Sequence, residues 1–188
     1  RSTEAYGSNK WYVNPTIEDI YAQGVSQAGS IGFALNQLMQ LRMKDTNVNG
    51  FDLNWKFYHI AESVIDHARN QGSVTSSLYY RNLAGTSSQD GTTFKDIAFS
   101  GLGPGVIAVD ADGLQDFDFE NIYLEESGGS PGTVFKLGDC VHIPFKNIEF
   151  SGTFTATKLW DIKNPREIII DSAHFVDANI GIFSDTVS

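Results

Sequence analysis

A short apolar phrase recurs seven times along this chain of 188 residues. Residues 94–101 (FKDIAFSG) and 145–152 (FKNIEFSG) are its clearest copies, and they share the form Φ-x-[D/N]-Φ-x-Φ-x-G, where Φ is apolar. Weaker copies begin at Ile17, Met43, Ile65, Phe119 and Ile169. Successive copies start 26, 22, 29, 25, 26 and 24 residues apart. An imperfect period of this length is typical of a solenoid, whose coils bury their apolar faces only against one another.

The spacing inside the phrase predicts strands joined by turns. The first two apolar positions are three residues apart and the next two are two apart, so the alternation of a strand is broken and the chain must bend. The bend falls on a column of mostly Asp and Asn, whose side chains bond to nearby backbone and tolerate turns. This column, called the bend column below, contains Asp19, Asp45, His67, Asp96, Asn121, Asn147 and Asp171. Glycine closes five of the seven phrases and indicates a second turn.

A second strand-like run follows each phrase, and a third apolar stretch leads into the next phrase, as in residues 114–119 and 140–145. We therefore expect an all-β, parallel β-helix of about seven coils, with three short strands per coil and equivalent strands stacked about 4.8 Å apart. Residues 16–188 form this domain, and residues 1–15, which lack the repeat, form an N-terminal cap or linker. The last coil has no polar cap, which favours a fragment of a longer protein or an edge covered by another subunit.

Composition excludes several classes of partner. The net charge of -10 disfavours nucleic acid and anionic membranes. No apolar run reaches the roughly 18 residues of a spanning helix, so we expect no membrane insertion. The single cysteine, Cys140, is expected to be a buried small hydrophobe. Residues 110–113 (DADG) lack the further ligands of a calcium loop and are predicted to be a turn. We expect no metal site and no cofactor.

The repeated phrases, in coils of this length, resemble the right-handed parallel β-helix of the pectin-lyase-like superfamily. Within it they are most similar to bacteriophage tailspikes and their polysaccharide-degrading relatives. The resemblance covers about residues 16–185 and lies in the repeat architecture. It implies a homotrimer on a virion tail, outside the cell, that acts on a bacterial capsule or O-antigen polysaccharide. The chain has neither the Asn-Thr-Asp nor the Asp-Asp signature of the polygalacturonases, so the resemblance assigns no catalytic residue.

The second strand of each coil offers a polar outer face. We expect one face to point inward, made of Leu35, Ile60, Tyr80, Val109, Leu137, Ile162 and Ile182. The neighbouring side chains would then line up outside on successive coils. Among them we predict substrate-binding residues, namely His59, Tyr79, Arg81 and Lys136. Four carboxylates on three consecutive coils are the candidate catalytic residues, namely Asp110, Asp112, Asp139 and Asp161.

Two reactions suit these groups. Glycoside hydrolysis needs two carboxyl groups, about 5–5.5 Å apart for retention and about 6.5–9.5 Å apart for inversion. A lyase needs a base and a cation that neutralises a uronate carboxylate, for which His59, Tyr79, Arg81 and Lys136 are suited. The acidic net charge weighs against a polyanionic substrate, so hydrolysis of a neutral or mildly acidic glycan is the first hypothesis.

Non-enzymatic functions fit the same pattern. The groove can recognise a glycan without cleaving it, or the coils can form the structural shaft of a viral fibre. Each candidate Asp can equally be an ordinary turn residue. Trp11, Trp55 and Trp160 are either sugar-stacking platforms or partly buried core residues. Phe57 and Phe183, predicted to be exposed, favour cover by another subunit.

Overall fold

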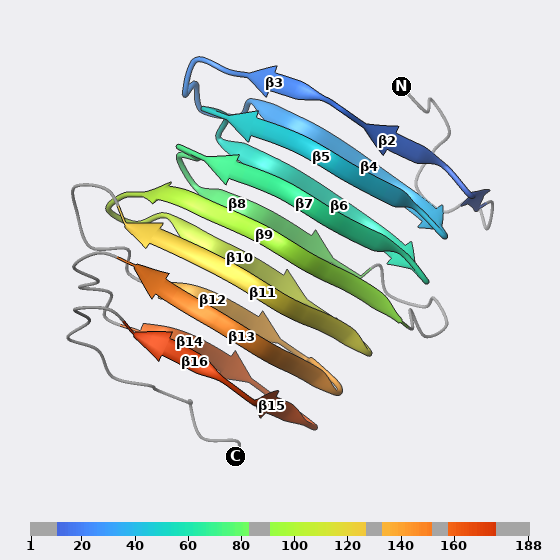
Figure 1. Cartoon of the computed structure of the whole chain (residues 1–188), viewed down its shortest axis with the longest axis vertical. Helices are drawn as coiled ribbons and strands as arrows, with labels where there is room; N and C mark the ends of the chain where they lie inside the picture. Colours follow the sequence, from blue (N-terminus) through green and yellow to red (C-terminus); the bar gives the residue numbers. More distant parts are fainter. Residues whose placement is uncertain (1–10, 83–90, 127–132, 152–157, 176–188) are drawn as a thin grey trace.

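The chain folds into a stack of parallel strands. The computed structural model describes residues 11–82, 91–126, 133–151 and 158–175. These residues form a parallel β-solenoid of about six turns with no helix (Figure 1). The predicted all-β parallel solenoid is therefore confirmed. The second strand run of the predicted seventh coil, with Ile182 and Phe183, lies outside the described residues.

Two sheets make up the walls of the solenoid. Sheet A contains the second strand run of each coil, and its neighbouring strands are all parallel. In spatial order its strands are β1 (Tyr12–Val13), β4 (Ile31–Met39), β6 (Leu53–Ala61), β8 (Ser76–Arg81), β10 (Ile107–Asp112), β12 (Thr133–Gly138) and β14 (Lys158–Lys163). From β4 to β14 every second strand along the chain enters this sheet, as expected when each coil contributes one strand per wall.

Sheet B contains the repeated phrases and lies in front in Figure 1. Its long strands are β5 (Arg42–Asn49), β7 (Val64–Gln71), β9 (Thr92–Leu102), β11 (Phe117–Glu126) and β13 (Ile143–Ser151). The phrase is split into two short strands at each end of the sheet, namely β2 (Thr16–Glu18) with β3 (Tyr21–Gln23), and β15 (Ile168–Ile170) with β16 (Ala173–Phe175).

The predicted bend within the phrase is present. Asp96 has φ 52° and Asn147 has φ 53°, the left-handed conformation that Asn and Asp adopt more readily than other non-glycine residues. Four more members of the column share this conformation, namely Asp19, Asp45, His67 and Asn121. The sheet continues across the bend, so the expectation of three separate strands per coil is wrong for the middle coils. The third apolar stretch is the start of the same bent strand.

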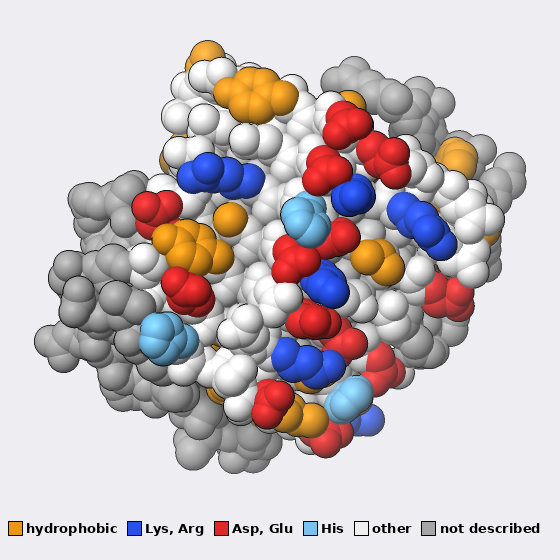
Figure 2. All heavy atoms as spheres, viewed as in Figure 1, with side chains coloured by type: hydrophobic (Ala, Val, Ile, Leu, Met, Phe, Trp, Pro, Cys, Tyr) orange, Lys and Arg blue, Asp and Glu red, His pale blue; other side chains and the backbone are white. Residues whose placement is uncertain are grey.

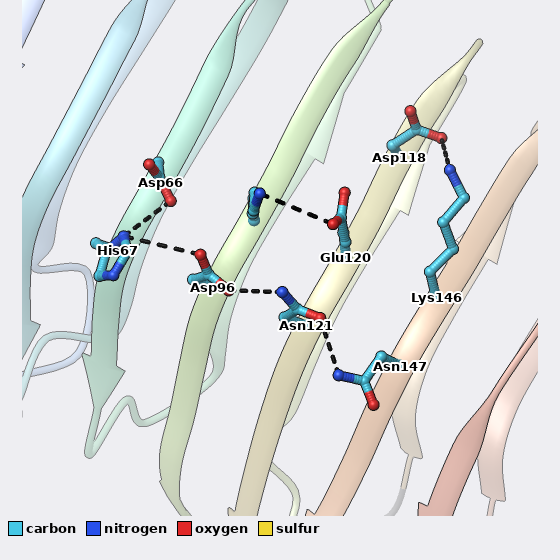
Figure 3. A network of polar contacts seen from close by, with 9 residues as sticks. Asp66, His67, Asp96, Asp118, Glu120, Asn121, Lys146 and Asn147 are labelled. Atoms are coloured by element: carbon cyan, nitrogen blue, oxygen red, sulfur yellow. Dashed lines mark hydrogen bonds and ion pairs between the residues drawn. The ribbon is translucent and has the colours of Figure 1, made fainter.

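Polar side chains connect the coils along this column. Asn147 Nδ2 donates to Asn121 Oδ1 at 2.8 Å, and Asn121 Nδ2 donates to Asp96 Oδ1 at 2.8 Å (Figure 3). An amide can donate to one neighbour and accept from the other, whereas an ionised carboxylate only accepts. The column therefore stabilises the bend twice, through backbone preference within a coil and through hydrogen bonds between coils.

Stacked rings fill the interior between the sheets. Phe119 lies between Phe94 and Phe145, with ring centroids 5.2 and 5.0 Å away and planes inclined by 9° in both pairs. Phe135 stacks on Trp160 in the same way at 5.5 Å. These rings are fully buried. Stacked aromatic pairs stabilise a fold by more than the burial of their apolar area alone.

Several predictions about individual side chains are settled by burial. Trp55 and Trp160 are fully buried and are core residues, not sugar platforms. Phe57, expected to be exposed, is also fully buried, because it pairs with Leu35 and Tyr80 in the inward row of sheet A. Tyr80, Leu137 and Ile162 point inward as predicted, and so do Ile60 and Val109.

The cysteine is buried as expected. Cys140 is inaccessible to solvent, and its thiol lies 3.1 Å from the carbonyl oxygen of Gly138, to which it donates. Burial raises the pKa of the Cys140 thiol to about 12. An exposed, activated thiolate is therefore not available at this position.

Candidate functional site

The outer face of sheet A brings most of the predicted site residues together. Parallel pairing aligns Lys56, Tyr79, Asp110, Lys136 and Asp161 on five consecutive strands. A second row, two residues further along each strand, contains Tyr58, Arg81, Asp112, Gly138 and Lys163. Adjacent strands are about 4.8 Å apart, so the two rows form a compact polar surface. We call this surface the sheet A face.

Asp110 is the centre of this surface. Arg81 Nη2 lies 2.7 Å from Asp110 Oδ1, and Arg81 Nη1 donates to the backbone carbonyl of Asp110 at 2.8 Å. Lys136 Nζ lies 3.6 Å from the other carboxylate oxygen, Oδ2. The side chain of Asp110 is only 13% exposed. Both oxygens of a largely buried carboxylate thus face cations, as a buried charge requires.

Tyrosines border the charged centre. The Arg81 guanidinium lies 4.0 Å from the ring centroid of Tyr79, a close cation–π contact. Lys56 Nζ lies 5.5 Å from the ring of Tyr58 and 6.0 Å from that of Tyr79. Tyr58 and Tyr79 meet edge to face, with centroids 6.3 Å apart. The aromatic part of the sheet A face therefore adjoins its ionic part without a break.

A depression of about 170 Å³ lies over strands β8 to β14. Five of the eight predicted residues line it, namely Arg81, Asp110, Asp112, Lys136 and Asp161. Gly138 and Lys163 also line it and were not predicted. A Cβ on Gly138 would lie 2.9 Å from Asp112 Oδ1, so the glycine leaves room for that carboxylate. No sequence signal identifies Gly138, because its role depends on how a neighbouring side chain leans.

His59 is not on the sheet A face. It is fully buried, its Nε2 lies 2.8 Å from Asn82 Oδ1, and its ring stacks on Trp11 at 5.7 Å. The expectation of an outward imidazole took Ile60 as the inward residue and His59 as its outward neighbour. Ile60 and His59 are both buried, and the left-handed backbone of His59, at φ 53°, interrupts the alternation between them.

Asp139 also lies away from this depression. It is in the turn after β12, where Asn164 Nδ2 donates to its Oδ1 at 3.0 Å. A second hollow of about 460 Å³ opens at this corner, lined by Gln115, Asp139, Val141, Asn164 and Arg166. Asp139 therefore lines this second hollow, whereas Asp110 lines the first depression.

Asp110 and Asp161 are two predicted catalytic carboxylates that line the same depression. They occupy the same row two strands apart, on either side of Lys136, which corresponds to about 9.6 Å between their backbones. That backbone separation is just above the range of about 6.5–9.5 Å that separates the two carboxyl groups of inverting glycosidases. Lys158 Nζ lies 3.3 Å from Asp161 Oδ1, so each of the two carboxylates has a cation beside it.

Comparisons with known proteins give no family for the chain. No protein-family model, no curated protein and no solved structure matches it. Within the part of the chain that the structure describes, no helix has the length and apolar character to cross a membrane. The geometry of the sheet A face is accordingly the main basis for a functional assignment.

Proposed function

We propose that the sheet A face binds a bacterial surface polysaccharide, as the tailspikes that the repeats resemble are expected to do. The observation that supports this most directly is the triad of Arg81, Asp110 and Lys136 in one depression beside Tyr79. Sugar binding needs fixed donors and acceptors for hydroxyl groups and a flat apolar surface for the ring. All three are present within the sheet A face.

The charges of this face suggest which glycan it prefers. Its two rows contain four cations, Lys56, Arg81, Lys136 and Lys163, and three carboxylates, Asp110, Asp112 and Asp161, although the whole chain has a net charge of -10. Neither Lys56 nor Lys163 has a carboxylate within ion-pair distance among the described residues. A glycan with some carboxylate groups would pair with these two lysines.

Binding is the first function and cleavage the second. Because Arg81 and Lys136 face both oxygens of Asp110, this carboxylate is better suited to hold the two cations in place than to transfer a proton. The spacing of Asp110 and Asp161 is the one observation that favours hydrolysis by inversion. The resemblance alone supports the further proposal of a homotrimer on a virion tail, which equilibrium sedimentation would test.

The experiment is a panel of bacterial capsule and O-antigen polysaccharides, assayed for binding, for released reducing ends and for unsaturated uronates. We expect binding of at least one acidic glycan, weakened about tenfold or more by Lys136→Gln, since one charge-assisted hydrogen bond contributes about 1.5–3 kcal/mol. Lys146→Gln is the matched control, because Lys146 pairs with Asp118 on sheet B. Equal losses in both variants, or no binding to any glycan, would refute the assignment.

Release of reducing ends would show that the protein is also a hydrolase. Asp161→Asn should then abolish the release of reducing ends while glycan binding persists. Unsaturated uronates would instead indicate a lyase. Binding without either product would leave a recognition module.

A further inference from the structure

A second cluster of polar side chains lies on the opposite wall of the solenoid. Figure 2 shows the sheet B side, where acidic and basic side chains gather along the stack. Within this band Asp66 and His67 on β7 lie beside Asp96 on β9, at the bend column (Figure 3). His67 Nδ1 is 3.0 Å from Asp66 Oδ1 and 3.8 Å from Asp96 Oδ2. One donor atom from each residue lies within 4.8 Å of the other two.

One of these distances already matches the spacing of two ligands around a bound metal ion. Zinc binds imidazole nitrogen and carboxylate oxygen at about 2.0–2.2 Å, so two ligands of one ion lie about 3.0–3.5 Å apart. The separation of 3.0 Å between His67 and Asp66 is within this range. The separation of 3.8 Å to Asp96 is longer, so binding would require the exposed His67 side chain to rotate towards Asp96. One nitrogen and two oxygens form a donor set suited to Zn²⁺, Co²⁺ or Ni²⁺.

The surrounding lysines do not neutralise the cluster. Lys44 and Lys95 flank Asp66 on the neighbouring strands. Lys44 Nζ nevertheless lies 3.6 Å from Asp45, and Lys95 Nζ lies 3.8 Å from Glu120. Both lysines thus pair outside the cluster, and among the described residues His67 is the ion-pair partner of Asp66 and Asp96. Two converging carboxylates leave a negative site that a cation would stabilise.

The hydrogen bonds of the bend column orient one ligand. Asn121 Nδ2 donates to Asp96 Oδ1 at 2.8 Å, and Asn121 is itself held by Asn147. Oδ2 of Asp96 is therefore the oxygen that faces His67. Such outer hydrogen bonds to ligating carboxylates are common at metal sites and contribute to affinity.

We propose that Asp66, His67 and Asp96 bind a divalent transition-metal ion, with Zn²⁺ as the best fit, which links two successive coils on the sheet B wall. The His67 side chain is 61% exposed, so solvent can complete the coordination shell and the ion can enter directly. The site is independent of the sheet A face. It also departs from the expectation, drawn from the sequence, that no metal site is present. The signal was His67 itself, the one imidazole in a column otherwise made of Asp and Asn.

The test is metal binding by untagged, chelator-treated protein, measured by calorimetry with Zn²⁺ and by the visible absorbance of Co²⁺. We expect one ion per chain, and His67→Asn should weaken binding at least about tenfold, as loss of a ligand or its support typically does. Asn is the residue of this column in other coils, so this variant keeps the bend. Asp96→Asn should weaken binding comparably.

His142→Asn is the matched control. His142 also has a left-handed backbone, at φ 51°, and its Nδ1 lies 2.7 Å from a single carboxylate, that of Asp116. Binding should be unchanged in this variant. Absence of Zn²⁺ and Co²⁺ binding, equal loss in the His67 and His142 variants, or a preference for Ca²⁺ or Mg²⁺ would each overturn the proposal. Circular dichroism of every variant separates a lost site from a lost fold.

Discussion

Arg81 reaches across one coil and holds Asp110 at two points, its carboxylate at 2.7 Å and its backbone carbonyl at 2.8 Å. Since the same guanidinium stacks on Tyr79 at 4.0 Å, one side chain fixes an anion, a strand and an aromatic ring together. These contacts fix the direction of the Arg81 side chain in the depression, so a ligand would find its donors and acceptors already arranged.

Replacing Arg81 by Ala should destabilise the fold by about 2 kcal/mol, because it leaves a largely buried carboxylate with fewer partners. Urea denaturation followed by fluorescence would measure this change. Arg81→Lys should recover only part of the loss, since an ammonium cannot make the forked contact. A change below about 0.5 kcal/mol in the alanine variant would contradict a structural role for the contact, and full recovery by lysine would show that the forked geometry is not required.

Gly138→Ala should disturb the depression and leave the fold intact. The new methyl group would displace the Asp112 carboxylate, which lies 2.9 Å from the position of the added Cβ. Asp112 is exposed, so its side chain can rotate away and the melting temperature should change little. Binding of a glycan by the sheet A face, as proposed above, should weaken in this variant. Gly103→Ala is the control, because nothing lies within 4 Å of a Cβ there.

The bend column can be dissected at Asn121, which has φ 53° and bonds to both neighbouring coils. Asn121→Gly keeps the left-handed conformation and removes the side-chain bonds, so it should cost about 1–2 kcal/mol, one or two typical hydrogen bonds. Asn121→Ala should cost about 1–2 kcal/mol more, because alanine disfavours that conformation. Equal unfolding free energies for the two variants would rule out a backbone contribution.

The ring stack predicts a larger effect. Phe119→Ala should destabilise the protein by about 3–5 kcal/mol, because it leaves a cavity between Phe94 and Phe145. Val25, which is 84% exposed, provides the comparison, and Val25→Ala should fall within about 0.5 kcal/mol of the parent. Denaturant unfolding of both variants checks the contrast. A small loss at Phe119 would mean that the interior rearranges to fill the space.

The buried thiol predicts a pH dependence. Burial raises the pKa of Cys140 from its usual 9.0 to about 12. The folded state therefore disfavours the thiolate, and this contribution to stability is complete below pH 9 and declines as the pH rises towards 12. Cys140→Ala should flatten the decline above pH 9, as measured by unfolding at a series of pH values. At pH 8 the native thiol should resist alkylating reagents until the protein unfolds.

The repeat is the part of the fold that the sequence predicts well. The spacing of apolar residues in the phrase, with Asp or Asn at the bend, is a local pattern, and Asp96 and Asn147 adopt the expected turn conformation. The pairing of strands follows from the period, since equivalent positions of successive coils must align. Asp110, Lys136 and Asp161 consequently lie in one row, as the stacking of coils predicts.

What the sequence leaves open depends on single backbone torsions and on side-chain direction. His59 was expected outside as the neighbour of an inward Ile60, yet both residues are buried, and the left-handed backbone of His59 interrupts the alternation between them. Asp139 was grouped with Asp110, yet it falls just beyond the strand end and turns a corner. The convergence of His67 with Asp66 and Asp96 depends on rotamers that no repeat pattern encodes.

Because sheet A gains one strand from each coil, this wall can lengthen only by whole coils. Duplication of a coil would lengthen the row of Lys56, Tyr79, Asp110, Lys136 and Asp161 by one rung and would leave the neighbours of most other rungs unchanged. The chain can thus acquire a longer surface by duplication and a different one by point substitution, without redesign of its core.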